Sequence, residues 1–257
     1  MKRHVVIIGI IIFVIIGLIV LTKHSKPGDK SKGLVAFVID DWGYNRKNLD
    51  LVFQIDRPIT VSILPNLRYS HDIATEVRKN GKIHDIILHL PMESKVNRAV
   101  EANTIRSGMK KNEILSILEK DIRNVVGLIG VSNHQGSKAT EDESVMNIIL
   151  TELKQRKLFF LDSLTTPNSV SLDVARSIGL KCAERDVFLD ITDQTDFKNF
   201  ESYIKKQIQE LSYIATQKGS AIGIGHNEKI TLQVIKDSIP ELEAKGIKIV
   251  PLKELVK

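Results

Sequence analysis

The chain has 257 residues, of which 42% are hydrophobic and 26% are charged, a balance typical of globular proteins rather than disordered or fibrous ones. Its single cysteine, Cys182, excludes an internal disulfide framework and a thiolate metal cluster. The formal net charge of +6 first suggests a nucleic acid or a membrane surface as partner. However, residues 1–32 carry six basic groups and one acidic group, which leaves 31 basic and 30 acidic groups in the remainder. This nearly neutral body argues against nucleic acid and fits a largely uncharged partner.

The N-terminal segment has the composition of a membrane anchor. Residues 5–21 are an unbroken run of 17 Val, Ile, Leu, Phe and Gly residues, long enough as a helix to span about 25 Å. Lys2 and Arg3 precede it, which favours a cytoplasmic N-terminus. Residues 22–32 are polar and are interpreted as a tether. We therefore predict a transmembrane helix and an extracytoplasmic domain; a cleaved signal peptide, which would give a secreted protein, is the alternative.

The rest of the chain alternates short β-branched runs with longer segments of helical periodicity. The strand candidates are residues 34–39, 59–64, 85–88, 128–131, 158–161, 182–189, 221–224 and 247–250. Their apolar composition is typical of parallel strands buried on both faces. We expect one domain over residues 33–257, an α/β fold with seven to eight mostly parallel strands. Periodicity does not show whether this sheet closes, but the number of strands favours a barrel. Residues 92–111 show no clear period and are predicted to form a long, functional loop over one end of the sheet.

Polar side chains follow the predicted strands, where parallel α/β folds place their chemistry. One carboxylate and two imidazoles can hold a divalent ion while leaving positions open for water and substrate. Adjacent aspartates can reach different parts of a site, although an Asp pair before a glycine is also compatible with a turn and helix cap. A lone histidine after a strand is usually structural, but three after different strands favour a common site. The candidates are Asp40, Asp41, His89, His134, Asp162, Arg185, Asp186 and His226.

Six motifs occur in an order that resembles the divergent polysaccharide deacetylase family, which is similar in fold to NodB-type carbohydrate esterases. They are residues 38–44 (VIDDWGY), 88–93 (LHLPME), 133–137 (NHQGS), 160–163 (FLDS), 185–190 (RDVFLD) and 223–226 (GIGH). The resemblance covers essentially all of residues 33–257. It implies a distorted (β/α) barrel with a zinc-like divalent ion. Active NodB-type esterases carry both metal histidines in one H-S/T-x-x-H motif, which this sequence lacks.

The resemblance also implies a role for each matching residue. Asp41, His89 and His134 would hold the ion, which the resemblance implies is zinc, whereas Asp40 would be the general base and His226 the general acid. Asp162, Arg185 and Asp186 would support them. The leading hypothesis is a metal-dependent hydrolase that removes N-acetyl groups from a cell-envelope carbohydrate. A membrane-tethered glycan-binding or scaffold protein and a metallohydrolase for another bond remain alternatives; no protein partner is indicated.

Overall fold

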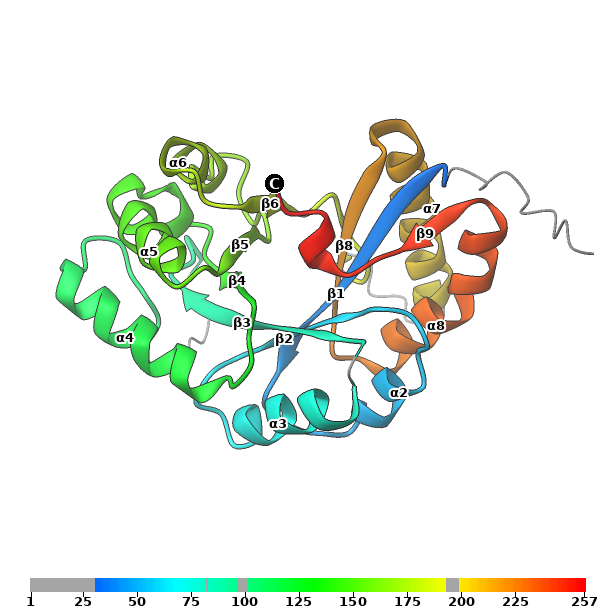
Figure 1. The fold of residues 1–257 in the computed structure, drawn as a ribbon, viewed down its shortest axis with the longest axis horizontal. Coiled ribbons are helices and arrows are strands. Elements are labelled where there is room, and N and C mark those ends of the chain that lie inside the picture. Colours follow the sequence, from blue (N-terminus) through cyan, green and yellow to red (C-terminus); the bar gives the residue numbers. More distant parts are fainter. Residues whose placement is uncertain (1–30, 82, 97–100, 193–198) are drawn as a thin grey trace, which may run out of the picture. The chain divides into compact units, whose positions relative to one another are not determined.

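A parallel sheet of nine strands forms the centre of the part of the chain that the structure describes (Figure 1). This computed structural model describes residues 31–81, 83–96, 101–192 and 199–257, and residues Ser31–Lys257 form one compact unit. The strands are β1 (Gly33–Trp42), β2 (Thr60–Ile63), β3 (Asp85–Met92), β4 (Gly130–Gln135), β5 (Phe159–Asp162), β6 (Cys182–Glu184), β7 (Val187–Phe188), β8 (Ser220–His226) and β9 (Ile247–Ile249).

Helices follow most of the strands and lie on the outside of the curled sheet (Figure 1). Every strand pair is parallel, and the order is β6-β5-β4-β3-β2-β1-β8-β7, with β9 beside the start of β1. The predicted α/β class is therefore confirmed. The helices are α2 (Leu49–Phe53), α3 (Ser70–Asn80), α4 (Lys111–Asn124), α5 (Glu143–Gln155), α6 (Ser171–Ile178), α7 (Phe200–Lys218) and α8 (Lys229–Ala244), with short 3-10 turns η1 (Ala139–Glu141) and η3 (Leu252–Glu254).

The sheet curls into an incomplete barrel whose two edges are joined by one short segment. The run 182–189, predicted as one strand, is two strands, because β6 pairs with β5 whereas β7 pairs with β8. Between them the Arg185 N–H donates to the Asp162 carbonyl at 3.0 Å, and the Asp186 N–H donates to the Ile222 carbonyl at 2.9 Å. The chain thus crosses from one edge of the sheet to the other within two residues, which distorts the barrel at this point.

The apolar residues of β1 explain why its sequence lacks an alternating pattern. Phe37 and Ile39 belong to the core between the sheet and the helices. Ala36 and Val38 point the other way and pack with Leu161 in a second core inside the curled sheet. Because alternate residues of a strand face opposite sides, a strand buried on both faces must be apolar throughout. Leu252, Leu255 and Val256 at the end of the chain complete the inner core.

Two strands extend further than the apolar runs suggested. β3 continues through His89 to Met92, and β4 continues through His134 to Gln135. The ladder between them pairs His89 with Ser132 and Pro91 with His134. The prediction that these histidines follow their strands is therefore wrong: both lie inside a strand. The backbone pairing does not depend on side-chain polarity, so the apolar run ends before the ladder does.

The predicted membrane anchor falls on residues 1–30, which lie outside the described residues. Among the residues that the structure does describe, no helix is both long and apolar enough to cross a membrane.

The inner core yields a stability prediction. Leu161 is fully buried, so Leu161→Ala leaves a cavity and is expected to lower the free energy of unfolding by about 2–5 kcal/mol. Ile191→Ala is the matched control: Ile191 is 48% exposed, and its truncation should change the free energy by less than about 0.5 kcal/mol. Chemical denaturation of residues 31–257 measures both. Equal effects of the two substitutions would contradict an apolar core inside the sheet.

Candidate metal centre

Strands β1, β3 and β4 bring the three predicted metal ligands to one end of the sheet. Asp41 lies in β1, His89 in β3 and His134 in β4, and these strands lie close together in the order β4-β3-β2-β1. The intervening strand β2 contributes Ser62, whose hydroxyl lies 3.0 Å from that of Ser132 in β4. A serine at this position takes little space, which allows the longer His89 side chain to reach the aspartates of β1.

A bulge in β1 turns both aspartates toward the same imidazole. The register between β1 and β2 shifts between Ile39 and Trp42, and Asp41 has a left-handed backbone with φ +64°. Asp40 Oδ2 and Asp41 Oδ1 then lie 3.5 and 3.4 Å from His89 Nε2. We expected adjacent aspartates to reach different parts of the site; instead they converge, because the bulge re-aims Asp41. Aspartate is among the few residues that adopt this backbone without a large steric cost.

The three candidate ligand atoms form a nearly equilateral triangle. His134 Nδ1 lies 3.1 Å from Asp41 Oδ1 and 3.2 Å from His89 Nε2, and the third side, between His89 Nε2 and Asp41 Oδ1, is 3.4 Å. Ligands about 2.0–2.1 Å from a tetrahedral zinc ion are separated by about 3.3 Å. Asp41 Oδ1 is also buried, and no hydrogen bond of good geometry reaches it in the described part of the chain. One carboxylate and two imidazoles at this spacing fit a divalent metal ion.

Each histidine also makes a contact through the ring nitrogen that is not a candidate metal ligand. His89 Nδ1 lies 2.8 Å from the Ser132 hydroxyl, which leaves Nε2 directed at the aspartates. His134 Nε2 lies 3.4 Å from the Glu101 carboxylate, which leaves Nδ1 on the side of Asp41. Such partners fix the tautomer and the orientation of a metal-binding imidazole.

Glu101 comes from the predicted loop over the sheet and was not among our candidates. The Tyr44 hydroxyl donates a hydrogen bond of 2.5 Å to its carboxylate. The loop is attached to the sheet nearby, since the Ile105 N–H donates to the Pro91 carbonyl at 2.9 Å and the Glu93 N–H donates to the Ile105 carbonyl at 2.8 Å. The length of the loop indicated a functional role, but no local pattern singled out this glutamate.

The charges of these groups are strongly coupled. Burial favours a neutral Asp41, but the nearby His134 and His89 outweigh it and hold its pKa far below the usual range. Burial likewise disfavours a charged His134, yet Asp41 and Glu101 raise its pKa to about 10. Asp40 differs, because burial dominates and raises its pKa. The centre therefore stabilises positive charge between carboxylates, as a cation site does.

His226 forms a separate pair with Asp190 beside the three-ligand cluster. It is the register partner of Asp40 across β1 and β8, and its Nδ1 lies 2.8 Å from Asp190 Oδ1. Asp190 Oδ2 accepts hydrogen bonds from the His226 N–H and the Thr231 hydroxyl, both at 2.7 Å. Burial lowers the pKa of His226, but Asp190 outweighs it and raises that pKa to about 9. Asp190 thus orients His226, a role we had not assigned to it.

The three supporting candidates lie elsewhere and hold the chain in place. Asp162 accepts hydrogen bonds from the Leu164 N–H and the Ser169 hydroxyl. Asp186 accepts from the Ile222 N–H and from Lys218. Arg185 donates to the Ser163 and Leu164 carbonyls, and its guanidinium lies over the Phe188 ring, which stacks on His226. Of these three, only Arg185 reaches toward the site, and it does so through Phe188.

Curated relatives of this chain are themselves uncharacterized. The chain is 34% identical to the protein YibQ of Escherichia coli over 210 residues, which are 82% of this chain and 63% of that protein. It therefore spans less than two thirds of that relative. It is also 31% identical to a protein of Haemophilus influenzae over 230 residues, 90% of this chain and 78% of the relative.

Solved structures share the fold. A protein of Agrobacterium tumefaciens, also uncharacterized, superimposes with a TM-score of 0.78 at 22% identity, over 89% of this chain and 91% of that one. A CE4 family pseudoenzyme from Bacillus anthracis reaches 0.53 at 14% identity, over 88% of this chain and 66% of that one. The sequence profile described as divergent polysaccharide deacetylase matches residues 37–256. Since that match spans nearly the whole barrel, the chain belongs to the divergent polysaccharide deacetylase family.

Proposed function

We propose that this protein is a zinc-dependent deacetylase that removes N-acetyl groups from a carbohydrate of the cell envelope. The observation that carries the proposal is the triangle of Asp41, His89 and His134 ligand atoms, with sides of 3.1–3.4 Å, flanked by Asp40 and His226. Oxygen and nitrogen ligands in this number and spacing suit zinc. Membership of the family supports a carbohydrate substrate, and the nearly neutral body of the chain fits an uncharged glycan.

The residues around the centre suit the hydrolysis of an acetamide. Asp41, His89 and His134 would hold the ion, which in such sites polarises a carbonyl and makes bound water more acidic. Asp40 Oδ1 is buried and accepts no hydrogen bond within the described ranges, and burial makes its carboxylate a stronger base. It can therefore take the proton of the attacking water. His226, protonated at neutral pH, can donate a proton to the departing nitrogen while Asp190 holds its ring.

The proposal includes a place of action outside the cytoplasmic membrane. The 17 apolar residues at positions 5–21 and the lysine and arginine before them support an anchored domain that acts on the envelope. A glycan-binding protein on the same fold is the second candidate, favoured by one observation: the two ligand histidines come from separate strands.

Zinc affinity of residues 31–257 tests the ligand set directly. Asp41→Asn and His89→Ala each remove a ligand and should abolish tight binding, whereas Ser132→Ala loses only the support of His89 and should weaken binding about 10–100-fold. Asparagine is the right replacement for Asp41 because it tolerates the left-handed backbone. His71→Ala, an exposed histidine outside the cluster, is the control for calorimetry. Unchanged affinity in the ligand variants would rule out this centre.

Acetate release from chitooligosaccharides or peptidoglycan fragments, with added zinc, tests turnover. Asp40→Asn and His226→Ala should each lower kcat by about 10²–10⁴-fold, since each removes one proton-transfer group. Zinc affinity of the same variants shows that the centre is intact. If the protein binds zinc but releases no acetate from any glycan, the deacetylase function fails and glycan binding becomes the better explanation.

The pH dependence of acetate release tests the role of Asp190. Only protonated His226 can donate, so activity should fall as the pH rises through its pKa of about 9. Asp190→Asn removes the charge that raises this pKa, so the alkaline limb of kcat/KM should move about 1–3 units to lower pH. NMR titration of the imidazole gives the same pKa without turnover. An alkaline limb that Asp190→Asn leaves in place would show that another group is the acid.

A further inference from the structure

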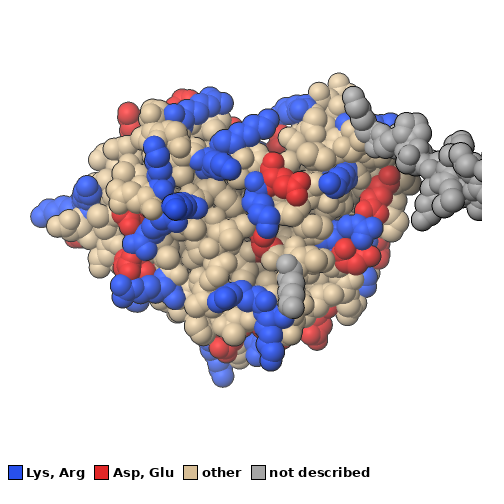
Figure 2. All heavy atoms as spheres, in the orientation of Figure 1, with Lys and Arg blue, Asp and Glu red and all other residues tan. Residues whose placement is uncertain are grey.

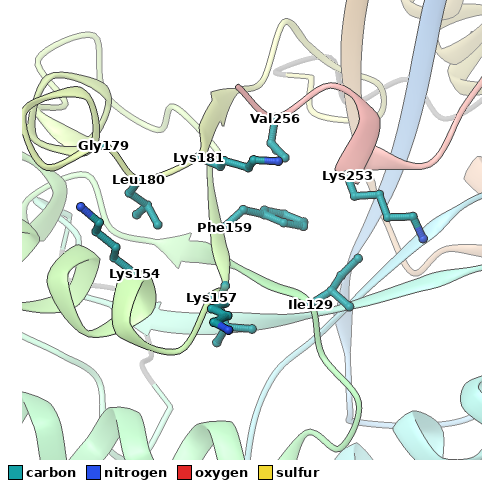
Figure 3. Close-up of a pocket in the computed structure, with 10 residues that line it drawn as sticks. Ile129, Lys154, Lys157, Phe159, Gly179, Leu180, Lys181, Lys253 and Val256 are labelled. Carbon is teal, nitrogen blue, oxygen red and sulfur yellow. The ribbon is translucent and has the colours of Figure 1, made fainter.

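A pocket lined by lysines opens at the end of the barrel opposite the metal centre. Its volume is about 440 Å³, and no acidic side chain is among the described residues that line it. Figure 3 shows the Phe159 ring in the middle of this pocket with lysine side chains around it. The lysine pocket is lined by Ile129, Lys154, Lys157, Leu158, Phe159, Gly179, Leu180, Lys181, Lys253 and Val256.

The four lysines come from segments that precede a strand or lie near the C-terminus. Lys157 lies before β5 and Lys181 before β6, so both stand at the N-terminal edge of the sheet. Lys253 lies 2.9 Å from Asp85, and Lys154 donates to the Ile178 carbonyl. Lys157 and Lys181 are exposed, and no ion pair to either forms within the part of the chain that is described. The ammonium groups of Lys157 and Lys181 are thus free to bind an anion.

The lysine pocket makes the charge of the barrel uneven. Lys and Arg side chains are spread over the face drawn in Figure 2, with Asp and Glu side chains among them. At the opposite end of the strands, Asp40, Asp41, Glu101 and Asp190 gather around the metal centre. An anionic surface would attract the unpaired lysines of the pocket and repel the carboxylates around the metal centre.

The chain enters the barrel at the same end as the lysine pocket. The Lys32 N–H donates to the Gly246 carbonyl at 2.8 Å, and Gly33 pairs with Ile247 at the start of β9. Any segment that precedes β1 therefore joins the barrel at the N-terminal edge of the sheet.

We propose that the N-terminal end of the barrel, centred on the lysine pocket, docks on a bilayer containing anionic phospholipid. Headgroup phosphates are the partners that unpaired lysines favour near a membrane. Ile83, two residues before the start of β3 at the same edge, is 48% exposed and offers an apolar side chain to the interface. The metal centre then faces away from the membrane, toward material outside it. This docking does not depend on the deacetylase proposal.

Vesicle sedimentation of residues 31–257, a compact unit with its own core, tests the docking without the leader. The domain should bind vesicles of phosphatidylcholine mixed with phosphatidylglycerol and not vesicles of phosphatidylcholine alone, and added salt should release it. Combining Lys157→Gln, Lys181→Gln and Lys253→Gln should lower partitioning at least about tenfold. The matched control combines Lys47→Gln, Lys111→Gln and Lys229→Gln, three exposed lysines that follow strands at the other end, and should change it less than about twofold.

The outcomes separate this proposal from the function of the metal centre. Binding that is absent, equal for both kinds of vesicle, or equally weakened by the two triple variants would overturn the docking. Zinc affinity and acetate release from soluble oligosaccharides should be unchanged in the pocket variant, which also shows that it is folded. Loss of vesicle binding with intact zinc affinity supports the docking even if no acetate release is ever found.

Discussion

The contact of one buried and one partly buried carboxylate with a buried imidazole is the constraint on which the rest of the site depends. Asp40 and His89 are each 2% exposed, and Asp41 lies against the same ring nitrogen. Burying carboxylates side by side is costly unless positive charge lies between them. Protonated His134 supplies positive charge, and a divalent ion supplies it more strongly. This contact is supported by the bulge of β1, by the serines next to His89 and by the glutamate next to His134.

Strand pairing explains how separate strands can replace a single ligand motif. Diagonal neighbours on adjacent strands are about 7–8 Å apart, still within reach of long side chains, and one turn of a helix brings residues i and i+4 to about 5–6 Å. His89 and His134 sit two register positions apart on adjacent strands, and their rings meet edge to face with centroids 4.9 Å apart. The β3–β4 ladder therefore provides the spacing that one segment provides in the H-S/T-x-x-H motif, and the absence of that motif does not remove a metal site.

The order of apolar runs predicted the parallel α/β fold and the end of the sheet where polar side chains meet. It predicted that polar side chains from different strands meet at that end, because the carboxyl ends of parallel strands converge whatever their sequence separation. The choice of Asp41, His89 and His134 as ligands came from the resemblance to the family. Glu101 was missed because its position depends on how a long loop folds back, and Asp190 because its pairing with His226 needs the register of β7 and β8. The convergence of Asp40 and Asp41 was missed because the left-handed backbone at Asp41 leaves no mark in composition.

The parallel arrangement also fixes the end of the barrel at which the chain enters it. In a parallel sheet whose first element is a strand, any segment before β1 joins the N-terminal edge, while the candidate metal ligands gather at the C-terminal edge. The chain therefore enters the barrel at the end opposite the candidate metal centre, independent of any surface charge. The lysine pocket lies at that N-terminal end, and Lys157 and Lys181 in it are exposed. Topology thus separates the lysine pocket from the open side of the candidate metal centre, where the Asp41 side chain is 33% exposed.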